Sequence, residues 1–266
     1  MTDFLFIDGS YYIFYRFFAL VNWWKMAKKD EPLENPSENE EFIEKFKLTF
    51  KSKIKELIKK LKLNNPILIV GKDCSRKDIW RMSLFPDYKG NRDGYEETLI
   101  NPGSFFKLAY NEKLFEESNA TVLFHQHLEA DDCIALTIKH IASHYPEAKS
   151  YIIASDQDYF QLLNDNVFLY NLKYKQVNTD KNSYKNPKKD LFIKCVTGDS
   201  SDNIPGIFSK CGPKTAAKLF ENKNDFIEKC EKENAKELYE RNKKIIDFNC
   251  IPTELSDSFY KNVLQL

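Results

Sequence analysis

The sequence predicts an α/β protein built on a mostly parallel sheet flanked by helices. Short, continuous apolar runs that stop at turn residues are typical of strands buried on both faces. Segments with apolar residues at helical spacing lie between these runs, and alternation of strand and helix favours a parallel sheet. With 266 residues, of which 42% are hydrophobic and 30% charged, the chain is long enough to bury a substantial core.

Five segments have the strand pattern. Residues 4–7 read Phe-Leu-Phe-Ile and are followed by Asp8, Gly9 and Ser10. Residues 66–70 are followed by Gly71, Lys72 and Asp73 in the same way. The remaining predicted strands are residues 121–124, 151–154, which run into Ser155 and Asp156, and 167–172.

Helical spacing predicts helices over residues 42–61 and 134–141. From about Pro187 the strand pattern stops, and we expect helices over residues 188–197, 213–222 and 225–248. The chain is therefore expected to divide into an α/β core over residues 1–186 and a smaller helical region over residues 187–266. Two polar stretches, residues 28–40 and 173–189, are expected to be exposed loops.

Composition argues against several classes of protein. The longest apolar run, residues 11–24, is broken by Arg16 and Asn22 and is too short to cross a bilayer. The start of the chain lacks the basic and small-residue pattern of a secretory signal, so we expect a cytoplasmic protein. The six cysteines contain no Cys-x-x-Cys pair, which disfavours a zinc knuckle or a disulfide scaffold.

Acidic residues gather where the predicted strands end and helices begin. Each alone is a common turn or cap residue, but the carboxyl ends of parallel strands share one edge of a sheet. Carboxylates that meet there repel one another unless cations neutralise them, and oxygen-only ligands favour Mg²⁺ or Mn²⁺. The candidate metal ligands are Asp8, Asp73, Glu129, Asp131, Asp132, Asp156, Asp158, Asp199 and Asp202.

Two ions in such a site would suit phosphodiester hydrolysis. An alternative is a zinc site at His125 and His127, although no cysteine lies near them in sequence. Lys plus Arg and Asp plus Glu both total 40, so without the nine candidate acids 31 acidic residues remain against 40 basic ones. A basic surface around an acidic site favours a polyanionic substrate.

Two basic segments could bind such a substrate. In the first, cations alternate with aromatic residues, as on surfaces that bind single strands, although a solvated amphipathic helix is the alternative. In the second, Pro213 begins a helix whose backbone N–H groups could hold a phosphate oxygen, although a plain helix-loop-helix is the alternative. The candidate contacts are Arg76, Arg81, Tyr88, Lys89 and Arg92 in the first segment and Lys210, Lys214 and Lys218 in the second.

Six motifs, taken in order, resemble the structure-specific 5' nuclease (flap endonuclease) family. The resemblance is strongest to its bacterial and bacteriophage branch and to the 5'-nuclease domain of bacterial DNA polymerase I. The motifs are Ile-Asp-Gly-Ser at 7–10, Tyr-Lys-Gly-Asn-Arg at 88–92, Glu-Ala-Asp-Asp at 129–132, Ser-Asp-Gln-Asp at 155–158, Gly-Asp-Ser-Ser-Asp-Asn-Ile-Pro-Gly at 198–206 and Gly-Pro-Lys-Thr-Ala at 212–216.

The resemblance implies a PIN-like core, a helical arch at about residues 74–110 and a C-terminal helix-three-turn-helix motif that grips duplex DNA. It implies two Mg²⁺ ions, with Mn²⁺ as a substitute, and makes Lys89 and Arg92 catalytic contacts of the scissile phosphate. Asp8, Asp73, Glu129 and Asp131 would hold the first ion, with Asp132 nearby. Asp156, Asp158 and Asp199 would hold the second, with Asp202 acting through water.

At two places the sequence departs from the pattern of this family. Residues 208–211 lengthen the turn before Lys214, where the family usually has a shorter turn with a further glycine, so the family's monovalent-cation site there lacks support. Arg16 lies one position beyond the family's arginine.

The resemblance implies a monomeric 5'-3' exonuclease and flap endonuclease from a phage, viral or bacterial source. It would act in DNA replication or repair on flapped, nicked or branched DNA, and on RNA primers annealed to DNA. Two alternatives stay open: a PIN-type ribonuclease that cuts single-stranded RNA, and a catalytically idle protein that binds branched DNA.

Overall fold

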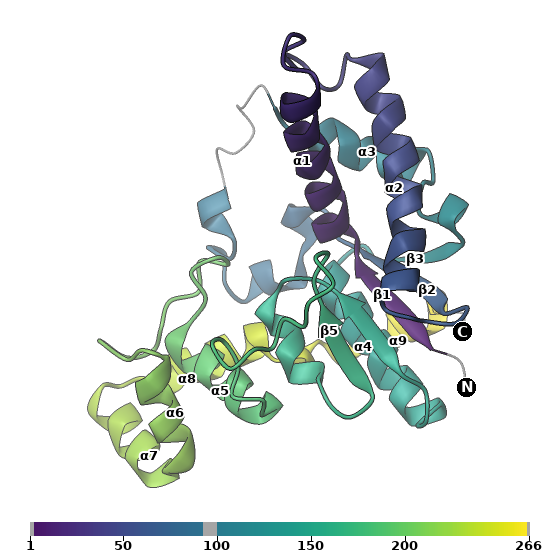
Figure 1. Cartoon of the computed structure of the whole chain (residues 1–266). Helices are drawn as coiled ribbons and strands as arrows, with labels where there is room; N and C mark the ends of the chain where they lie inside the picture. The colour runs from purple at the N-terminus through teal and green to yellow at the C-terminus, as the bar shows by residue number, and fades with distance from the viewer. Residues whose placement is uncertain (1–2, 93–99, 265–266) are drawn as a thin grey trace.

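The computed structural model describes residues 3–92 and 100–264, and its centre is a five-stranded sheet between two layers of helices (Figure 1). All strands run parallel in the order β3-β2-β1-β4-β5. The predicted α/β class and parallel sheet are therefore confirmed. The strands are β1 (Phe4–Asp8), β2 (Ile67–Lys72), β3 (Ala120–Phe124), β4 (Ser150–Ile153) and β5 (Val167–Tyr170).

The helices alternate with the strands in the first two thirds of the chain and follow one another after β5 (Figure 1). They are α1 (Gly9–Ala27), α2 (Glu40–Lys60), α3 (Gly103–Asn111), α4 (Ala130–His144), α5 (Pro187–Thr197), α6 (Pro213–Glu221), α7 (Lys223–Lys232), α8 (Lys236–Ile246) and α9 (Thr253–Asn262).

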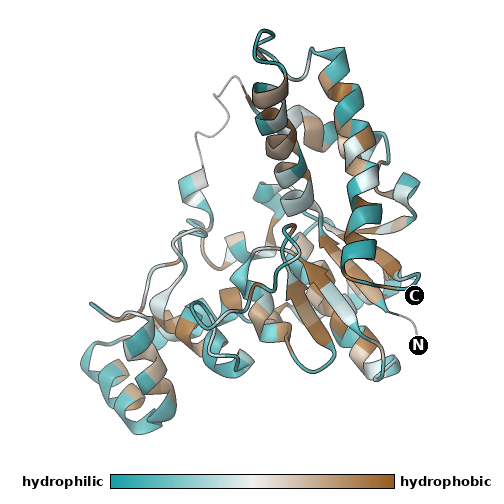
Figure 2. Ribbon diagram, in the orientation of Figure 1, coloured by the Kyte–Doolittle hydropathy of each residue, from teal (hydrophilic) through white to brown (hydrophobic). Residues whose placement is uncertain are grey.

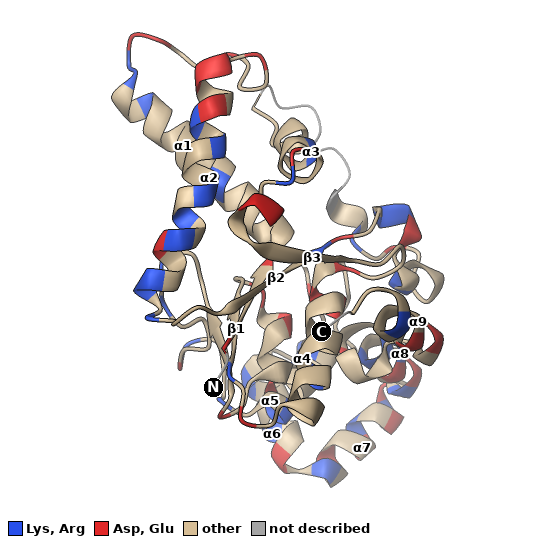
Figure 3. Ribbon diagram, turned by 90° about the vertical axis from the view of Figure 1, so that its right-hand side faces the viewer, with Lys and Arg blue, Asp and Glu red and all other residues tan. Residues whose placement is uncertain are grey.

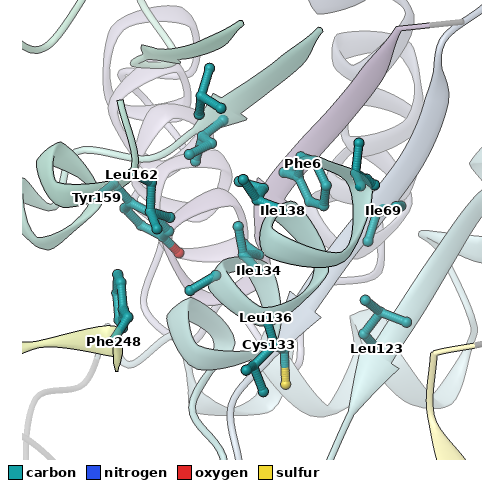
Figure 4. Close-up of a cluster of buried hydrophobic side chains, with 14 of the residues drawn as sticks. Phe6, Ile69, Leu123, Cys133, Ile134, Leu136, Ile138, Tyr159, Leu162 and Phe248 are labelled. Atoms are coloured by element: carbon teal, nitrogen blue, oxygen red, sulfur yellow. The ribbon is translucent and has the colours of Figure 1, made fainter. Parts of the chain in front are cut away.

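Both faces of the sheet are covered, which explains why its strands are continuously apolar (Figure 2). Leu5 and Ile7 point to a cluster built with α1, α2 and α3, and the lysines of α2 lie on its outer side (Figure 3). Phe4 and Phe6 point to the opposite cluster, in which α4 and the C-terminal Phe259 pack on the sheet (Figure 4). No helix in the described ranges has the length and hydropathy to cross a bilayer.

Gly71 lets α4 approach β2 closely. A Cβ at this position would come within 2.5 Å of the carbonyl oxygen of Ala130. The approach sets the first turn of α4 beside the residues that follow β2, and the backbone N–H of Ala130 donates to Asp73 Oδ1 at 2.8 Å. Because Gly71 has no side chain, the segment that carries Asp73 and the acidic first turn of α4 can lie against each other.

Several helices differ from the sequence prediction. The single helix expected over 225–248 is wrong: α7 and α8 are separate, because the chain turns at Asn234 with a φ of 52°. The described part of the 76–92 segment is not an amphipathic helix but a series of short 3₁₀ turns, at Arg76–Asp78, Trp80–Ser83 and Gly90–Arg92. Helices α1, α3 and α9 were not predicted, since their apolar residues lack a clear helical spacing or occupy short segments.

Part of the predicted arch, residues 93–99, lies outside the described residues. The division at residue 187 stays a prediction. Two clusters of side chains cross it: Phe248 and Phe259 pack with the strands, and Tyr88 packs with Cys195 and Ile245.

The close approach at Gly71 can be tested by Gly71→Ala. We expect the free energy of unfolding to fall by about 1–3 kcal/mol, because the methyl group forces β2 and α4 apart. Gly212→Ala is the matched control, since a Cβ there meets nothing within 4 Å, and it should change stability by less than about 1 kcal/mol. Equal losses in urea denaturation of both variants would contradict this account.

Candidate metal centre

Three acidic residues follow the central strands at the carboxyl edge of the sheet. Asp8 ends β1, Asp73 follows β2 and Asp156 follows β4, which are the two strands that pair with β1. Asp8 also caps α1: its Oδ1 accepts from the backbone N–H of Tyr11 at 2.9 Å and its Oδ2 from the Tyr159 hydroxyl at 3.1 Å. Burial, and then the neighbouring carboxylate of Asp73, raise the pKa of Asp8 to about 7.

A first cluster of acids stands at the start of α4. Glu129, Asp131 and Asp132 each offer an oxygen within 4.8 Å of the others. Glu129 and Asp132 form a capping box, so the N-terminus of the helix itself orients two of these carboxyl groups. Burial, and then the charge of Asp132, raise the pKa of Asp131 well above its usual value.

Arg81 is built into this cluster and does not face the surface. Its side chain is 3% exposed and donates to both oxygens of Asp132 at 2.7 Å, to Glu129 at 3.0 Å and to the Ile245 carbonyl at 2.7 Å. This placement corrects the prediction that Arg81 contacts substrate. The hydrogen bonds of its guanidinium go to Asp132, Glu129 and the Ile245 carbonyl. Arg81 therefore neutralises these two carboxylates and holds them in orientation.

Tyr88 differs from prediction for a similar reason. It is 3% exposed, and its single hydroxyl proton is shared between Glu129, at 3.0 Å, and Asp202, at 3.1 Å. Its ring is therefore not available for stacking on a base. The next residue, Lys89, forms an ion pair with Glu129 and lies 3.9 Å from Asp202 Oδ1. Although burial alone would raise it, the pKa of Glu129 is lowered by Lys89 and Arg81.

Two turns that are distant in sequence are hydrogen-bonded to each other beside this cluster. The Lys89 backbone donates to the Asp202 carbonyl at 2.9 Å, the Asn91 amide to Ser200 at 2.7 Å and the Asn203 amide to Asp87 at 2.8 Å. The motifs at 88–92 and 198–206 are therefore parts of one site. The side chain of Arg92 lies outside the part of the chain that the structure describes.

A second cluster joins Asp158, Asp199 and Asp202, with one oxygen from each within 4.8 Å. Gly198, at a φ of 74°, opens the turn that carries Asp199. Burial raises the pKa of Asp158 to about 7, more than the ammonium of Lys194 lowers it. Burial opposes ionisation of Asp199 too, but Lys194 and the hydrogen bonds from Ser201 bring its pKa down to about 2.

Lys194 is a site residue that sequence reasoning missed. Its ammonium contacts Asp158 and lies 2.7 Å from Asp199 and 3.9 Å from Asp156. The available signal was a single cation within the apolar run Leu-Phe-Ile-Lys-Cys-Val at 191–196, where a lysine needs a buried partner.

The other candidates fall into two groups. Lys214 lies in the first turn of α6, and Lys210 and Lys218 are exposed near it. His125 and His127 bond to the Ser258 hydroxyl and the Asp78 carbonyl, and they join no metal-binding group among the described residues. The zinc alternative therefore has no support from the geometry.

The donors fit hard divalent cations. Nine carboxyl groups face three cations that ion-pair with them in the described ranges, Arg81, Lys89 and Lys194, so negative charge is in large excess. Burial raises the pKa values of Asp8, Asp131 and Asp158, and repulsion from the neighbouring carboxylates raises them further. The buried hydroxyl of Tyr110, near Asp73 and Asp8, also has no hydrogen-bond partner among the residues that the structure describes. All these donors are oxygens, which suit Mg²⁺ or Mn²⁺.

Comparison with known proteins agrees with this geometry. Residues 3–189 match the family model of the 5'-3' exonuclease N-terminal resolvase-like domain. The chain is 38% identical to the 5'-3' exonuclease of Bacillus subtilis over 149 residues, which are 53% of this chain and 47% of that protein. It is 34% identical to the DNA polymerase I of Rhizobium leguminosarum over 150 residues, 55% of this chain and 14% of that protein.

One similar solved structure is the bacteriophage T5 D15 flap endonuclease in a complex with DNA and metal ions. It is 19% identical, with a TM-score of 0.67 over 98% of this chain and 97% of that one, and so supports the fold. The chain thus spans about a seventh to a half of the two relatives compared by sequence.

The buried role of Arg81 predicts a large effect on stability. Arg81→Met keeps most of the side-chain volume but leaves Asp132 and Glu129 without their buried partner, which should cost about 3–5 kcal/mol. Lys77→Met, four residues earlier and exposed, should stay within about 0.5 kcal/mol of the wild type. Similar urea midpoints for the two variants would show that Arg81 does not neutralise the cluster.

The raised pKa values predict a pH dependence in the absence of metal. Asp8 and Asp158 hold protons up to about pH 7 when folded but only to about pH 4 when unfolded, so the folded state binds more protons between these values. The free energy of unfolding should therefore fall as pH rises from 4 to 7, by up to about 1.4 kcal/mol per pH unit for each group.

Adding Mg²⁺ at pH 8 should restore the lost stability, since the ion replaces the protons. Thermal melts at pH 5 and pH 8, in EDTA and in Mg²⁺, measure both effects, with Asp158→Asn as the variant whose profile should be flatter. Greater stability at pH 8 than at pH 5 in EDTA would overturn the assignment.

Proposed function

The chain belongs to the 5'-3' exonuclease family, through the N-terminal resolvase-like domain, and on that premise we propose that it is a divalent-metal-dependent 5' nuclease. The observation that carries the proposal is the meeting of two carboxylate clusters, from three segments of the chain, with Asp8 and Asp73 at one edge of the sheet. Hydrolysis of phosphodiesters in flapped, nicked or 5'-ended DNA is the activity that such a site supports best.

In this proposal the acids are divided between two ions. Asp8, Asp73, Glu129 and Asp131 hold the first, with Asp132 nearby. Asp156, Asp158 and Asp199 hold the second, with Asp202 acting through water. When bound, the ions activate water for attack on phosphorus and stabilise the leaving oxygen. Arg81 and Tyr88 fix Glu129 and Asp132 in orientation, so that little rearrangement is needed at the site.

Lys89 is the cation best placed to meet the scissile phosphate. Its side chain is 16% exposed, whereas that of Arg81 is 3% exposed, and its partner Glu129 is itself a candidate ligand. An ion bound by Glu129 would compete for that carboxylate, which would free the ammonium for a phosphate oxygen. Together with Arg92, Lys89 would stabilise the charge that develops in the transition state.

Duplex DNA would be held by the start of α6. The backbone N–H groups of Thr215 and Ala216 donate to the Gly212 carbonyl, which leaves that of Lys214 as the donor for a phosphate oxygen. The side chains of Lys214 and Lys218 would add charge without reading sequence. The same proposal has four further parts. The physiological ion is Mg²⁺, the substrate is DNA and also RNA primers annealed to DNA, the protein is a monomer, and its location is cytoplasmic.

A set of three substrates tests it. A 5'-labelled flap, a nicked duplex and a single-stranded RNA are each incubated with Mg²⁺ and with EDTA. We expect short 5' products from the flapped and nicked DNA in Mg²⁺ alone. Cleavage of the RNA in preference to the flap would favour a PIN-type ribonuclease, and DNA binding without any cleavage would favour an idle binding protein.

The metal assignment is tested by Asp156→Asn. This variant should lose at least about a hundredfold in cleavage rate while binding flapped DNA nearly as well, because one ligand of the second ion is removed. Asp165→Asn, an exposed acid in a turn outside both clusters, is the matched control and should cleave normally. Normal turnover by Asp156→Asn would contradict the assigned role.

A further inference from the structure

The acids of the second half of the site and the start of α6 line one groove. Its volume is about 1060 Å³. Asp156, Asp158 and Asp199 line it, and so do residues 212–215, which begin α6. Residues 180–184 also line it, although they come from the polar segment that the sequence analysis assigned to an exposed loop.

This loop is held in place on both sides of Lys181. Val177 and Thr179, before it, are bonded to the side chain of Asn182, which follows it: the Thr179 backbone N–H donates to Asn182 Oδ1 at 2.8 Å, and the Asn182 amide donates to the Val177 carbonyl at 2.9 Å. After it, the hydroxyl of Ser183 and the backbone N–H of Tyr184 both donate to Asp190 in α5, at 2.7 and 2.8 Å. The loop is therefore a fixed wall of the groove.

Most cations near the groove already have partners. Lys185 pairs with Asp180 at 2.7 Å, Lys189 with Glu221 at 2.6 Å, and Lys194 with the acids of the second cluster. Lys181 and Lys214 also line the groove and form no ion pair within residues 3–92 and 100–264. One comes from the loop and the other from α6, so each of these two segments contributes a cation that is available to an anionic ligand.

We propose that residues 180–184 form a second contact for the phosphate backbone of duplex DNA, with Lys181 as the side chain that binds phosphate. This inference rests on the proposed function. A strand whose scissile phosphate lies at the metals and whose duplex is held at α6 would follow the groove between them. Lys181 and Lys214 would then hold different phosphates of the same bound DNA, independently of sequence.

The test compares Lys181→Ala with the matched control Lys173→Ala. Lys173 is an exposed lysine of the same polar segment, residues 173–189, but it does not line the groove, so both variants lose one charge from that segment. Binding of a fluorescent 5'-flapped duplex is measured by anisotropy between 50 and 200 mM KCl (about the range over which phosphate contacts dominate affinity). Ca²⁺ replaces Mg²⁺ because it takes the same oxygen ligands.

For Lys181→Ala we expect binding about two- to fivefold weaker at the lowest salt concentration. The slope of log K against log salt should be smaller by about 0.9, the value for one lost phosphate contact. Lys173→Ala should keep the wild-type slope, and Lys181→Ala combined with Lys214→Ala should lose about twice as much as either alone. The thermal midpoint should not change, because Lys181 is exposed.

A slope for Lys181→Ala equal to that of the wild type, or to that of Lys173→Ala, would overturn the inference. This failure is distinguishable from failure of the proposed function. If only the inference is wrong, the wild-type protein still binds and cleaves flapped DNA. If the proposed function is wrong, the wild type itself does not cleave it.

Discussion

The carboxyl groups of Asp8, Asp73 and Asp156 are held together at the carboxyl edge of the sheet although their charges repel one another. The strand order leaves no other arrangement, because β1 pairs with β2 on one side and β4 on the other, and an acid ends or follows each of these strands. Burial, and then repulsion from Asp73, raise the pKa of Asp8 to about 7. The need for cations at this edge follows from the topology of the fold.

The protein supplies part of this positive charge itself, in two different ways. Arg81 is buried and makes hydrogen bonds with both oxygens of Asp132, so it belongs to the scaffold of the first cluster. Lys89 and Lys194 are each 16% exposed, pair with candidate metal ligands and lie where a bound ion or phosphate would compete for their partners. A fixed cation thus sets the geometry, and more accessible ones can respond to ligands.

The helical region after residue 187 contributes Lys194, Asp199 and Asp202 to the site. Asp199 and Ile204 close their turn with two backbone hydrogen bonds of 2.8 Å, and the Lys89 backbone is bonded to the same turn at Asp202. Lys194 and Asp199 come from α5 and the turn that follows it, yet they meet Asp158 from the end of β4. The start of α6 and the acids of the second cluster are therefore linked through α5, which packs against both α6 and the turn that carries Asp158.

The sequence by itself determined the class of fold, the parallel strands and the acidic segments. Apolar runs bounded by acids at 4–8 and 67–73 report burial on both faces and the edge at which side chains collect, and these properties are local. Only the tertiary structure decided that Arg81 and Tyr88 face inward, that Lys194 joins the second cluster and that residues 225–248 break at Asn234. The sequence around a lysine or arginine looks the same whether its side chain binds a phosphate or a buried carboxylate. Its role depends on neighbours that are distant along the chain, such as Asp132 for Arg81, and these are brought together only by folding.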